Sequence, residues 1–515
     1  MASKVNLDAF IQREDFEILE RQSLGQTKST ISINDLKRTE FFYSVLRKPD
    51  FQRETSEWDI AKVAEFIESF LEGDLIPAVI LWKSSSQYIF VVDGSHRLSA
   101  LAAWINDDYG DKDISRIYYE GYIHPEQLKI AERARRQIEK KVGSFQIYQN
   151  AIQHPKNYDS NVTTRAQRLG SLAIQLQWVE GDAGKAEASF FKINQKAQPI
   201  DKTELKVLEA RKKPTGIAAR AILRSGKGHK YWSRFSKQVQ SEIEGLANDI
   251  NSLLFNPPLE SPIKTLDLPI GGKTYSAQTL PLILELIYIC NRLNPDRELD
   301  DDHDGKQTIQ FLKTCKKVAE RINSLHPGSL GLHPIIYFYS QTGVHKPASF
   351  YAVASLILEL EQKRLFDKFT SVRKAFEEIV LEYDYLVQQI VRQFRGAPAA
   401  SPHIKEFYLL LINRLGEGKS KNAVIKEILA EEKYKYLVSS SPNLPTDQVD
   451  FSSQVKSQVF IREALKNPIK CRICGGLLHT LSITIDHEIR VRDGGKGAQE
   501  NAQLAHPYCN STYKN

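Results

Sequence analysis

The chain has 515 residues, of which 41% are hydrophobic and 26% are charged, and its net charge at pH 7 is +7. This length exceeds one ordinary domain, so we expect about three domains. No segment approaches the roughly 18 to 20 uninterrupted apolar residues of a membrane span, and the charged N-terminal segment lacks the apolar stretch of a secretory signal. The sequence therefore predicts a cytoplasmic protein without a membrane partner. Its mildly basic charge permits nucleic-acid binding but does not argue for it.

Strand-like and helix-like stretches alternate in the N-terminal part of the chain. Residues 57–73 have apolar side chains at helical spacing and end at a glycine. The short apolar runs 75–82 and 88–94 are typical of buried strands, and residues 96–105 then predict a helix. This order indicates an α/β domain, to which we assign residues 1–215.

The next part of the chain, residues 216–437, has an almost wholly helical pattern. Its longest segments show apolar stripes with period 3.6 opposite charged faces, at residues 307–322, 348–365 and 371–394. No motif in this helical domain indicates a particular chemistry. Residues 438–455 are rich in Ser and Pro and predict a linker, and residues 456–515 form the last domain.

The segment "VVDGSHRLSALAAW" places an Asp-Gly turn between a predicted strand and a predicted helix. Backbone N–H groups and the helix dipole favour an anion at such a helix start, and Arg97 can donate two hydrogen bonds to a phosphate. The alternative is a plain turn at Asp93-Gly94 with His96 as a helix cap. The sequence therefore predicts a phosphate or nucleotide site, with the plain turn left open.

The last forty-five residues contain two pairs of potential metal ligands. Cys471 and Cys474 form Cys-x2-Cys, and His506 and Cys509 form His-x2-Cys thirty-two residues later. Such a short segment buries little core, so a metal would supply folding free energy, and four ligands of this kind suit tetrahedral zinc. The other two of the five cysteines are isolated, which argues against a disulfide framework.

Residues suited to phosphodiester hydrolysis lie within this zinc frame. Asp486-His487 and Asn501 stand between the two ligand pairs, and Asn510 follows the second pair. Hydrolysis of a phosphodiester needs a base for the attacking water and a cation for the developing charge, and a histidine suits the first role. An Asp-His pair alone is common by chance. Three basic residues of the same segment are either DNA contacts or solvated side chains: Arg490, Arg492 and Lys496.

In combination these elements resemble the HNH nuclease family, whose pattern is Cys-x2-Cys, Asp-His, Gly-Gly, Asn, and a second Cys-x2-Cys followed by Asn or His. The resemblance covers about residues 468–515. It implies a ββα-metal domain in which His487 is the general base and Asn501 orients it. It also implies that Asp486 and Asn510 bind one catalytic Mg²⁺ or Mn²⁺. Two positions depart from the commonest pattern: a histidine replaces the third cysteine, and an asparagine replaces the last histidine.

Further motifs flank the Asp-Gly-Ser-His-Arg segment. They are Phe51-Gln52-Arg53, Trp58 and Ile76-Pro77 before it, and Phe191, Ile193, Asn194, Pro199 and Glu204 after it. Over about residues 40–210 the chain resembles the N-terminal domain of GmrSD-type modification-dependent restriction proteins, of the ParB/sulfiredoxin-like superfamily. The resemblance implies binding of a nucleoside triphosphate, often with hydrolysis, coupled to recognition or cleavage of phage DNA. The residues that it assigns to nucleotide binding are Gln52, Arg53, Asp93, Gly94, Ser95, His96, Arg97 and Asn194.

One difference bears on hydrolysis. The usual motif of the GmrSD-type domain is Asp-Gly-Gln-Gln-Arg, whereas this chain has Asp-Gly-Ser-His-Arg. A histidine at that place also occurs in DndB-like relatives. The resemblance therefore supports nucleotide binding more than it supports hydrolysis.

The two resemblances together predict a multidomain α+β protein with a ParB-like α/β domain, an all-helical middle domain and a zinc-stabilised HNH domain. We expect a DNA endonuclease of prokaryotic anti-phage defence, regulated by nucleotide or DNA-modification sensing in the N-terminal domain. Its expected ligands are structural Zn²⁺, catalytic Mg²⁺ or Mn²⁺ and a nucleoside triphosphate. Its expected partners are phage or modified DNA, with a homo-oligomer or a defence-system protein as further candidates. The alternatives are a DndB-like DNA-binding regulator of DNA modification without cleavage activity, and an RNA-directed nuclease; the presence of Asp486, His487 and Asn510 favours cleavage.

Overall fold

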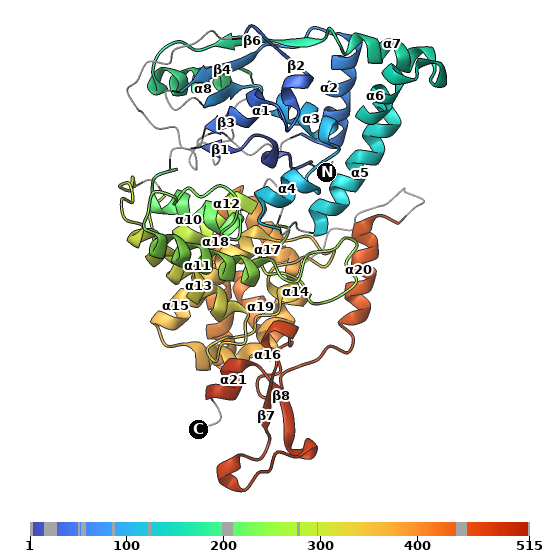
Figure 1. The fold of residues 1–515 in the computed structure, drawn as a ribbon. Coiled ribbons are helices and arrows are strands. Elements are labelled where there is room, and N and C mark those ends of the chain that lie inside the picture. The colour runs from blue at the N-terminus through green and yellow to red at the C-terminus, as the bar shows by residue number, and fades with distance from the viewer. Residues whose placement is uncertain are drawn as a thin grey trace. The chain divides into compact units, whose positions relative to one another are not determined.

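The structure is a computed structural model (Figure 1). It describes residues 4–14, 28–49, 52, 58–84, 88–121, 123, 125–197, 210–274, 279–295, 297–438 and 451–512. Arg53, Pro199, Glu204 and most of the expected linker lie outside the described residues. The chain divides into two compact units: an N-terminal unit of residues 1–211 with 227–231, and a C-terminal unit of residues 212–226 with 232–515. No helix within the described ranges is long and apolar enough to cross a membrane.

The N-terminal unit contains a mixed six-stranded sheet with the order β1-β3-β5-β4-β6-β2. Its strands are β1 (Arg13–Glu14), β2 (Thr30–Ser32), β3 (Leu46–Pro49), β4 (Val79–Lys83), β5 (Ile89–Asp93) and β6 (Ala173–Trp178). β1, β3 and β5 run parallel, β4 pairs antiparallel with β5 and parallel with β6, and β2 pairs antiparallel with β6. The carboxyl ends of the first three strands therefore share one edge of the sheet, where ligands of parallel sheets bind.

The central strands β4 and β5 are buried on both faces, which explains why the runs at 75–82 and 88–94 are apolar. On one face Leu81 and Val91 join the main core with α2 (Ile60–Glu72), α3 (Ser95–Asn106) and α5 (Pro125–Val142). On the other face Trp82 and Phe90 pack against α8 (Ala183–Ala197). The smaller elements of this unit are η1 (Asp8–Phe10), η2 (Asn34–Leu36), α1 (Phe41–Val45), α4 (Asp113–Tyr118), α6 (Phe145–Gln153), η3 (Pro155–Asn157) and α7 (Ser160–Arg168).

The helix expected at 57–73 is α2, and its ends follow from local chemistry. Asp59 accepts a hydrogen bond from the Lys62 backbone N–H (2.9 Å) and caps the N-terminus. Gly73 ends the helix in the left-handed conformation (φ 80°), which a glycine adopts without strain. The strand–turn–helix order predicted for the N-terminal domain is confirmed, because β4, β5 and α3 follow one another as expected.

The described residues of the C-terminal unit are helical except for one hairpin and the loops. Its helices are α10 (Pro214–Leu223), α11 (Lys237–Phe255), α12 (Thr279–Cys290), α13 (Lys306–Ile322), α14 (Pro334–Tyr337), α15 (Pro347–Gln362), α16 (Phe366–Glu382), α17 (Asp384–Phe394), α18 (Ala397–Gly416), α19 (Lys421–Ala430), α20 (Ser453–Ala464) and α21 (Pro507–Thr512). The hairpin pairs β7 (Thr484–His487) with β8 (Ala502–Ala505), and short 3-10 turns are η4 (Glu432–Tyr434), η5 (Thr480–Ser482), η6 (Val491–Asp493) and η7 (Gln499–Asn501). The hairpin projects from the helices of this unit, and α21 returns to them (Figure 1). The mixed α/β, helical and zinc-knuckle parts that the sequence predicts are therefore all present.

A buried charge cluster joins the first strands of the N-terminal unit. The Asp8 carboxylate, 1% exposed, accepts hydrogen bonds from Arg13 Nη2 (3.0 Å), Lys48 Nζ (2.6 Å) and the Tyr118 hydroxyl (3.0 Å). Arg13 belongs to β1 and Lys48 to β3, and Arg13 also donates to the backbone carbonyl of Gln52. The cluster therefore fixes the chain just after β3, at the edge of the sheet that carries the candidate nucleotide residues.

We expect Asp8→Ala to lower the free energy of unfolding of this unit by about 3 kcal/mol, because it removes a carboxylate that two buried cations share. Urea denaturation of the full chain measures the change. The exposed Asp74 provides the control, and Asp74→Ala should stay within about 0.5 kcal/mol of wild type. Equal stabilities of the two variants would show that the cluster does not hold the strands.

Candidate zinc centre, nuclease site and nucleotide site

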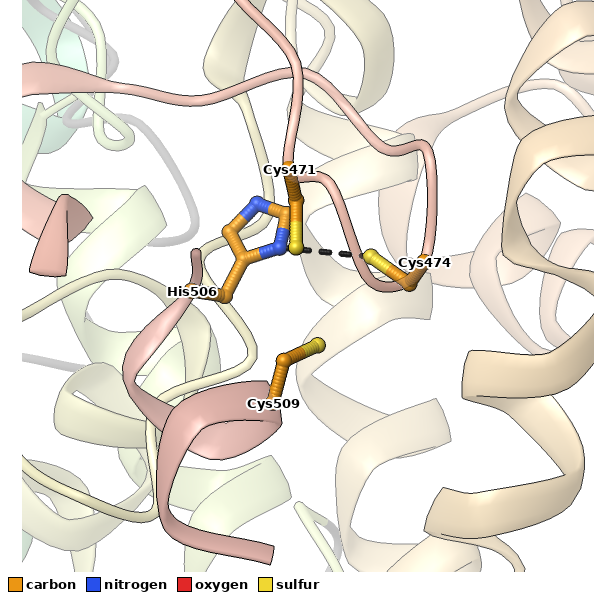
Figure 2. A group of neighbouring side chains, drawn as sticks. All are labelled: Cys471, Cys474, His506 and Cys509. Carbon is orange, nitrogen blue, oxygen red and sulfur yellow. Dashed lines mark hydrogen bonds between the residues drawn. The ribbon is translucent and has the colours of Figure 1, made fainter. Parts of the chain in front are cut away.

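Four donor side chains converge near the end of the chain: Cys471, Cys474, His506 and Cys509 (Figure 2). Their ligand atoms all lie within 4.8 Å of one another. The first two lie in the loop before the hairpin, and the last two lie at the start of α21, so the two predicted ligand pairs meet at one point. Three sulfurs and one imidazole nitrogen fit a closed tetrahedral zinc site. Hydrogen bonds from the other thiols, Cys474 first, lower the pKa of Cys471 and so favour the thiolate that binds a metal.

The histidine of this Cys3His cluster is held with one nitrogen directed to the sulfurs. His506 Nε2 lies 2.9 Å from the Leu477 carbonyl oxygen, which can only accept, so Nε2 carries the proton. Nδ1 is then unprotonated, and it lies 3.3 Å from Cys474 Sγ. Burial lowers the pKa of His506, and Arg373 nearby lowers it further. A neutral imidazole with its free nitrogen toward three sulfurs is ready to bind a metal.

The loop that carries the first two cysteines is a tight turn. Gly475 N–H donates to the Cys471 carbonyl (3.0 Å), and Cys471 N–H donates to the Gly476 carbonyl (2.9 Å). Gly475 has φ 71°, and an added Cβ would lie 3.2 Å from Lys374 Cβ. The backbone conformation therefore favours glycine at this position, and the Lys374 side chain of α16 leaves little room for a Cβ.

Side chains of α16 surround the zinc centre from outside. Arg373 donates from Nη1 toward His506 Nδ1 (3.2 Å) and from Nη2 to the Gly331 carbonyl (2.9 Å), and its Nη1 also reaches the Leu330 carbonyl. Its Nε donates to Glu377 Oε1 (2.6 Å). The other oxygen of Glu377 accepts from the Leu477 N–H (3.1 Å). Both charged side chains are 2% exposed or less, so an ion pair of the helical part is buried against the zinc cluster.

The predicted catalytic metal ligands lie on neighbouring elements. Asp486 is in β7, and Asn510 of α21 donates through Nδ2 to the Ile485 carbonyl beside it (3.1 Å) and to Thr484 Oγ1 (3.2 Å). Asp486 is 7% exposed; its Oδ2 accepts a long hydrogen bond from Gln503 Nε2 (3.4 Å). Within the part of the chain that the structure describes, Asp486 Oδ1 is buried and has no hydrogen-bond partner. A buried carboxylate oxygen without a partner is costly, and a bound cation would satisfy it.

The predicted base and its supporting asparagine lie at the far end of the hairpin. His487 is the last residue of β7, pairs with Ala502 and is half-buried. No described residue forms a hydrogen bond with its imidazole. Asn501 directly precedes Ala502, and its side-chain amide forms hydrogen bonds with the loop that follows His487. Its Oδ1 accepts from the Ile489 N–H (2.6 Å), and its Nδ2 donates to the Ile489 and Lys496 carbonyls (3.0 and 2.9 Å). Asn501 therefore contacts the loop after His487 and leaves the imidazole accessible.

The three basic residues proposed for DNA contact lie in this same loop between β7 and β8. Arg492 and Lys496 are exposed and Arg490 is half-buried. In the described structure none of the three side chains forms a hydrogen bond or an ion pair. The loop also exposes two large apolar side chains, Ile489 (57%) and Val491 (64%). The cations are therefore available to phosphate groups.

In the N-terminal unit, the predicted nucleotide residues gather at the shared carboxyl edge of β3 and β5. Gln52 follows β3, and its Nε2 lies 3.4 Å from the carbonyl oxygen of Val92 in β5. Asp93 ends β5, and Gly94 and Ser95 start α3. Gly94 has φ 98°, and an added Cβ would lie 2.8 Å from Val79 Cγ2. The strand, the turn and the helix therefore meet as an anion site at a helix N-terminus requires.

Neighbouring residues hold the side chains of His96 and Arg97 in place. His96 stacks on Trp58, with ring centroids 5.7 Å apart. Arg97 binds Asp93 Oδ2 (2.6 Å) and the Pro77 carbonyl (2.7 Å), so in this structure its guanidinium braces β4 against β5 rather than pointing to solvent. Arg53 is outside the described residues, and Asn194 lies in α8 with its side chain outside the description. The edge thus brings together six of the eight predicted residues.

Three features that support these sites cannot be inferred from the sequence motifs. The Arg373–Glu377 pair lies more than ninety residues before the first cysteine of the cluster. Asp8 likewise lies 40 residues before Lys48 and outside the motif of Gln52. The pairing of Gln503 with Asp486 can be recognised only once the register of β7 on β8 is known. The only indication of the Arg373–Glu377 pair in the sequence is that two opposite charges stand four residues apart on an otherwise apolar helical stripe.

Two family models match the chain. The one described as GmrSD restriction endonuclease, N-terminal domain, matches residues 32–209, and the one described as HNH endonuclease matches residues 471–515. The chain therefore combines a GmrSD N-terminal domain with a C-terminal HNH endonuclease domain, as the two resemblances predict. These matches support a nuclease of the GmrSD restriction type, and the HNH domain implies a metal-dependent enzyme with DNA as its substrate. Neither a search of curated proteins nor a search of solved structures found a match.

For the zinc centre we expect purified protein to contain one zinc per chain, measured by elemental analysis, and Cys509→Ser to lose it. Loss of the metal should lower the melting temperature of the chain, because the small domain buries only a short apolar core around its cysteines. Cys315→Ala is the control, since this cysteine lies in α13 outside the cluster. A zinc content that is unchanged in Cys509→Ser would contradict the assignment.

Proposed function

We propose that this protein cleaves DNA at its HNH site with His487 as general base, and that nucleotide or DNA-modification sensing by the N-terminal domain regulates cleavage. The observation that carries the nuclease proposal is Asp486 Oδ1, a buried carboxylate oxygen with no partner in the described chain. Asn510 contacts the same strand from α21, so both proposed cation ligands belong to one small area. Oxygen donors of this kind suit Mg²⁺ or Mn²⁺.

The chemistry follows from the residues around this area. The His487 imidazole takes a proton from a water molecule, whose oxygen attacks the phosphorus while the bond to the leaving oxygen breaks. A cation held by Asp486 and Asn510 would stabilise the negative charge on the phosphate and the leaving oxygen. Asn501 fixes the loop after His487, and so keeps the imidazole at the end of the strand. Arg490, Arg492 and Lys496 hold the DNA backbone near the base.

We expect His487→Ala to reduce cleavage of plasmid and modified phage DNA by at least about a hundredfold, because general-base catalysis typically contributes that much. Each DNA is tested with Mg²⁺ or Mn²⁺, with and without nucleoside triphosphates. His303→Ala, an exposed histidine outside the site, is the matched control and should cut like wild type. If the wild-type protein binds DNA but cleaves it under none of these conditions, the DndB-like DNA-binding function is favoured over the nuclease function. Cleavage of RNA instead of DNA would favour the RNA-directed alternative.

The regulatory part of the proposal depends on the edge of the sheet in the N-terminal unit. Gln52 is 5% exposed, and its Oε1 has no hydrogen-bond partner among the described residues. An unsatisfied amide oxygen needs a donor or a cation, and the ribose hydroxyls and base amino groups of a nucleotide supply donors. The adjacent start of α3 offers backbone N–H groups to phosphate. These two features support binding of a nucleotide at this edge, with its ribose or base near Gln52 and its phosphates near the start of α3.

A nucleoside triphosphate at about 100 times its dissociation constant should stabilise the chain by about 2.7 kcal/mol, which thermal unfolding detects as a rise in melting temperature. Gln52→Ala should remove most of that rise, whereas Gln146→Ala, an exposed residue of α6, should retain it. Measuring phosphate release in the same samples separates binding from hydrolysis. No rise with any nucleotide would remove nucleotide sensing from the proposal, and DNA modification would remain as the signal.

A further inference from the structure

The helical part of the C-terminal unit contributes a cation to the zinc centre. A zinc ion with three thiolates and one neutral imidazole has a net negative charge, which is costly to bury. The sulfurs of Cys471 and Cys509 are buried, and the guanidinium of Arg373 lies against the ligand set, with Nη1 3.2 Å from His506 Nδ1. A zinc ion bound to Nδ1 would take the place of this hydrogen bond and leave the guanidinium charge beside the cluster. Arg373 is itself 1% exposed, so its charge is not screened by water.

The environment of Arg373 keeps it charged and fixed. Its Nε donates a hydrogen bond to Glu377 Oε1 (2.6 Å), and an arginine guanidinium stays protonated in proteins. The remaining donors are satisfied by the Leu330 and Gly331 carbonyls. Gly331 has φ 58°, and a Cβ there would collide with the His506 ring, so the backbone of the helical part lies directly against this ligand.

Further bonds connect the same two parts of the chain around the zinc centre. Glu377 accepts from the Leu477 N–H, and the Leu477 carbonyl in turn accepts from His506 Nε2. On the other side, Tyr508 N–H donates to the Ser329 carbonyl (2.9 Å). One chain of hydrogen bonds therefore runs from α16 through Leu477 to the ligand histidine.

We propose that Arg373 balances the negative charge of the zinc–thiolate cluster from outside the ligand set. This inference rests on the zinc cluster and does not require cleavage activity, so a failure of the nuclease proposal leaves it standing.

The test measures zinc affinity of the full chain by competition with a chromogenic chelator. Arg373→Met keeps most of the side-chain volume but removes the charge, and we expect zinc affinity to fall about 10- to 100-fold, as for other outer-shell residues. Arg373→Lys keeps a cation without the planar fork and should show a smaller loss. Arg392→Met, on the exposed face of α17, is the matched control and should bind zinc like wild type.

Glu377→Gln separates a role in zinc binding from a general role in folding. This change removes the carboxylate but leaves Arg373 charged, so the melting temperature should fall while zinc affinity does not weaken. A role of the pair in folding alone would instead weaken zinc binding in the Glu377 and Arg373 variants in parallel. Wild-type zinc affinity in Arg373→Met, or in Arg373→Lys if the Met variant does not fold, would overturn the proposal.

Discussion

The convergence of Cys471, Cys474, His506 and Cys509 on one point is the constraint on which the C-terminal part of the structure depends. The hairpin between the two ligand pairs exposes most of its own side chains, and its loop has exposed isoleucine and valine instead of a core. Such a segment has little apolar burial to offset the entropy of ordering it. The donor set closes the segment at its base, and the register of β7 on β8 then brings Asp486 opposite Gln503 and His487 next to Asn501. The geometry of the candidate nuclease site thus depends on the convergence of these four donors.

The same frame explains why the C-terminal site could be predicted from the sequence in more detail than the rest. Metal ligands and the Asp-His pair follow one another at short, fixed spacings, so the order of residues nearly determines which of them meet. The Arg373–Glu377 pair is different, because it belongs to a helix more than ninety residues before the first cysteine and only tertiary packing brings it to His506. Period-3.6 patterns predict that α16 is a helix with a buried face, but not that a guanidinium on that face meets a metal ligand.

The N-terminal unit could be predicted from the sequence only in part. Continuous apolar runs correctly indicated strands buried on both faces, and the Asp-Gly turn was correctly placed between β5 and α3. The sequence did not reveal that β3 and β5 are parallel neighbours, and this pairing is what brings Gln52 beside Val92. It also did not reveal that the Arg97 guanidinium would donate hydrogen bonds to Asp93 and to the Pro77 carbonyl just before β4. A short motif gives residue types and local conformation, whereas strand order depends on pairings across the whole sheet.

Both candidate sites share one physical feature: a buried side-chain oxygen, Gln52 Oε1 in one unit and Asp486 Oδ1 in the other, has no partner within the described residues. Each such oxygen costs on the order of 1 to 3 kcal/mol, which the surrounding structure must offset. The Asp8 cluster beside the Gln52 backbone and the zinc centre beside the hairpin are the rigid elements that do so. Polar groups held unsatisfied by rigid neighbours are preorganised for a ligand, since binding then recovers the desolvation cost instead of adding to it. Neither candidate site would therefore need a large rearrangement of its own residues to bind such a ligand.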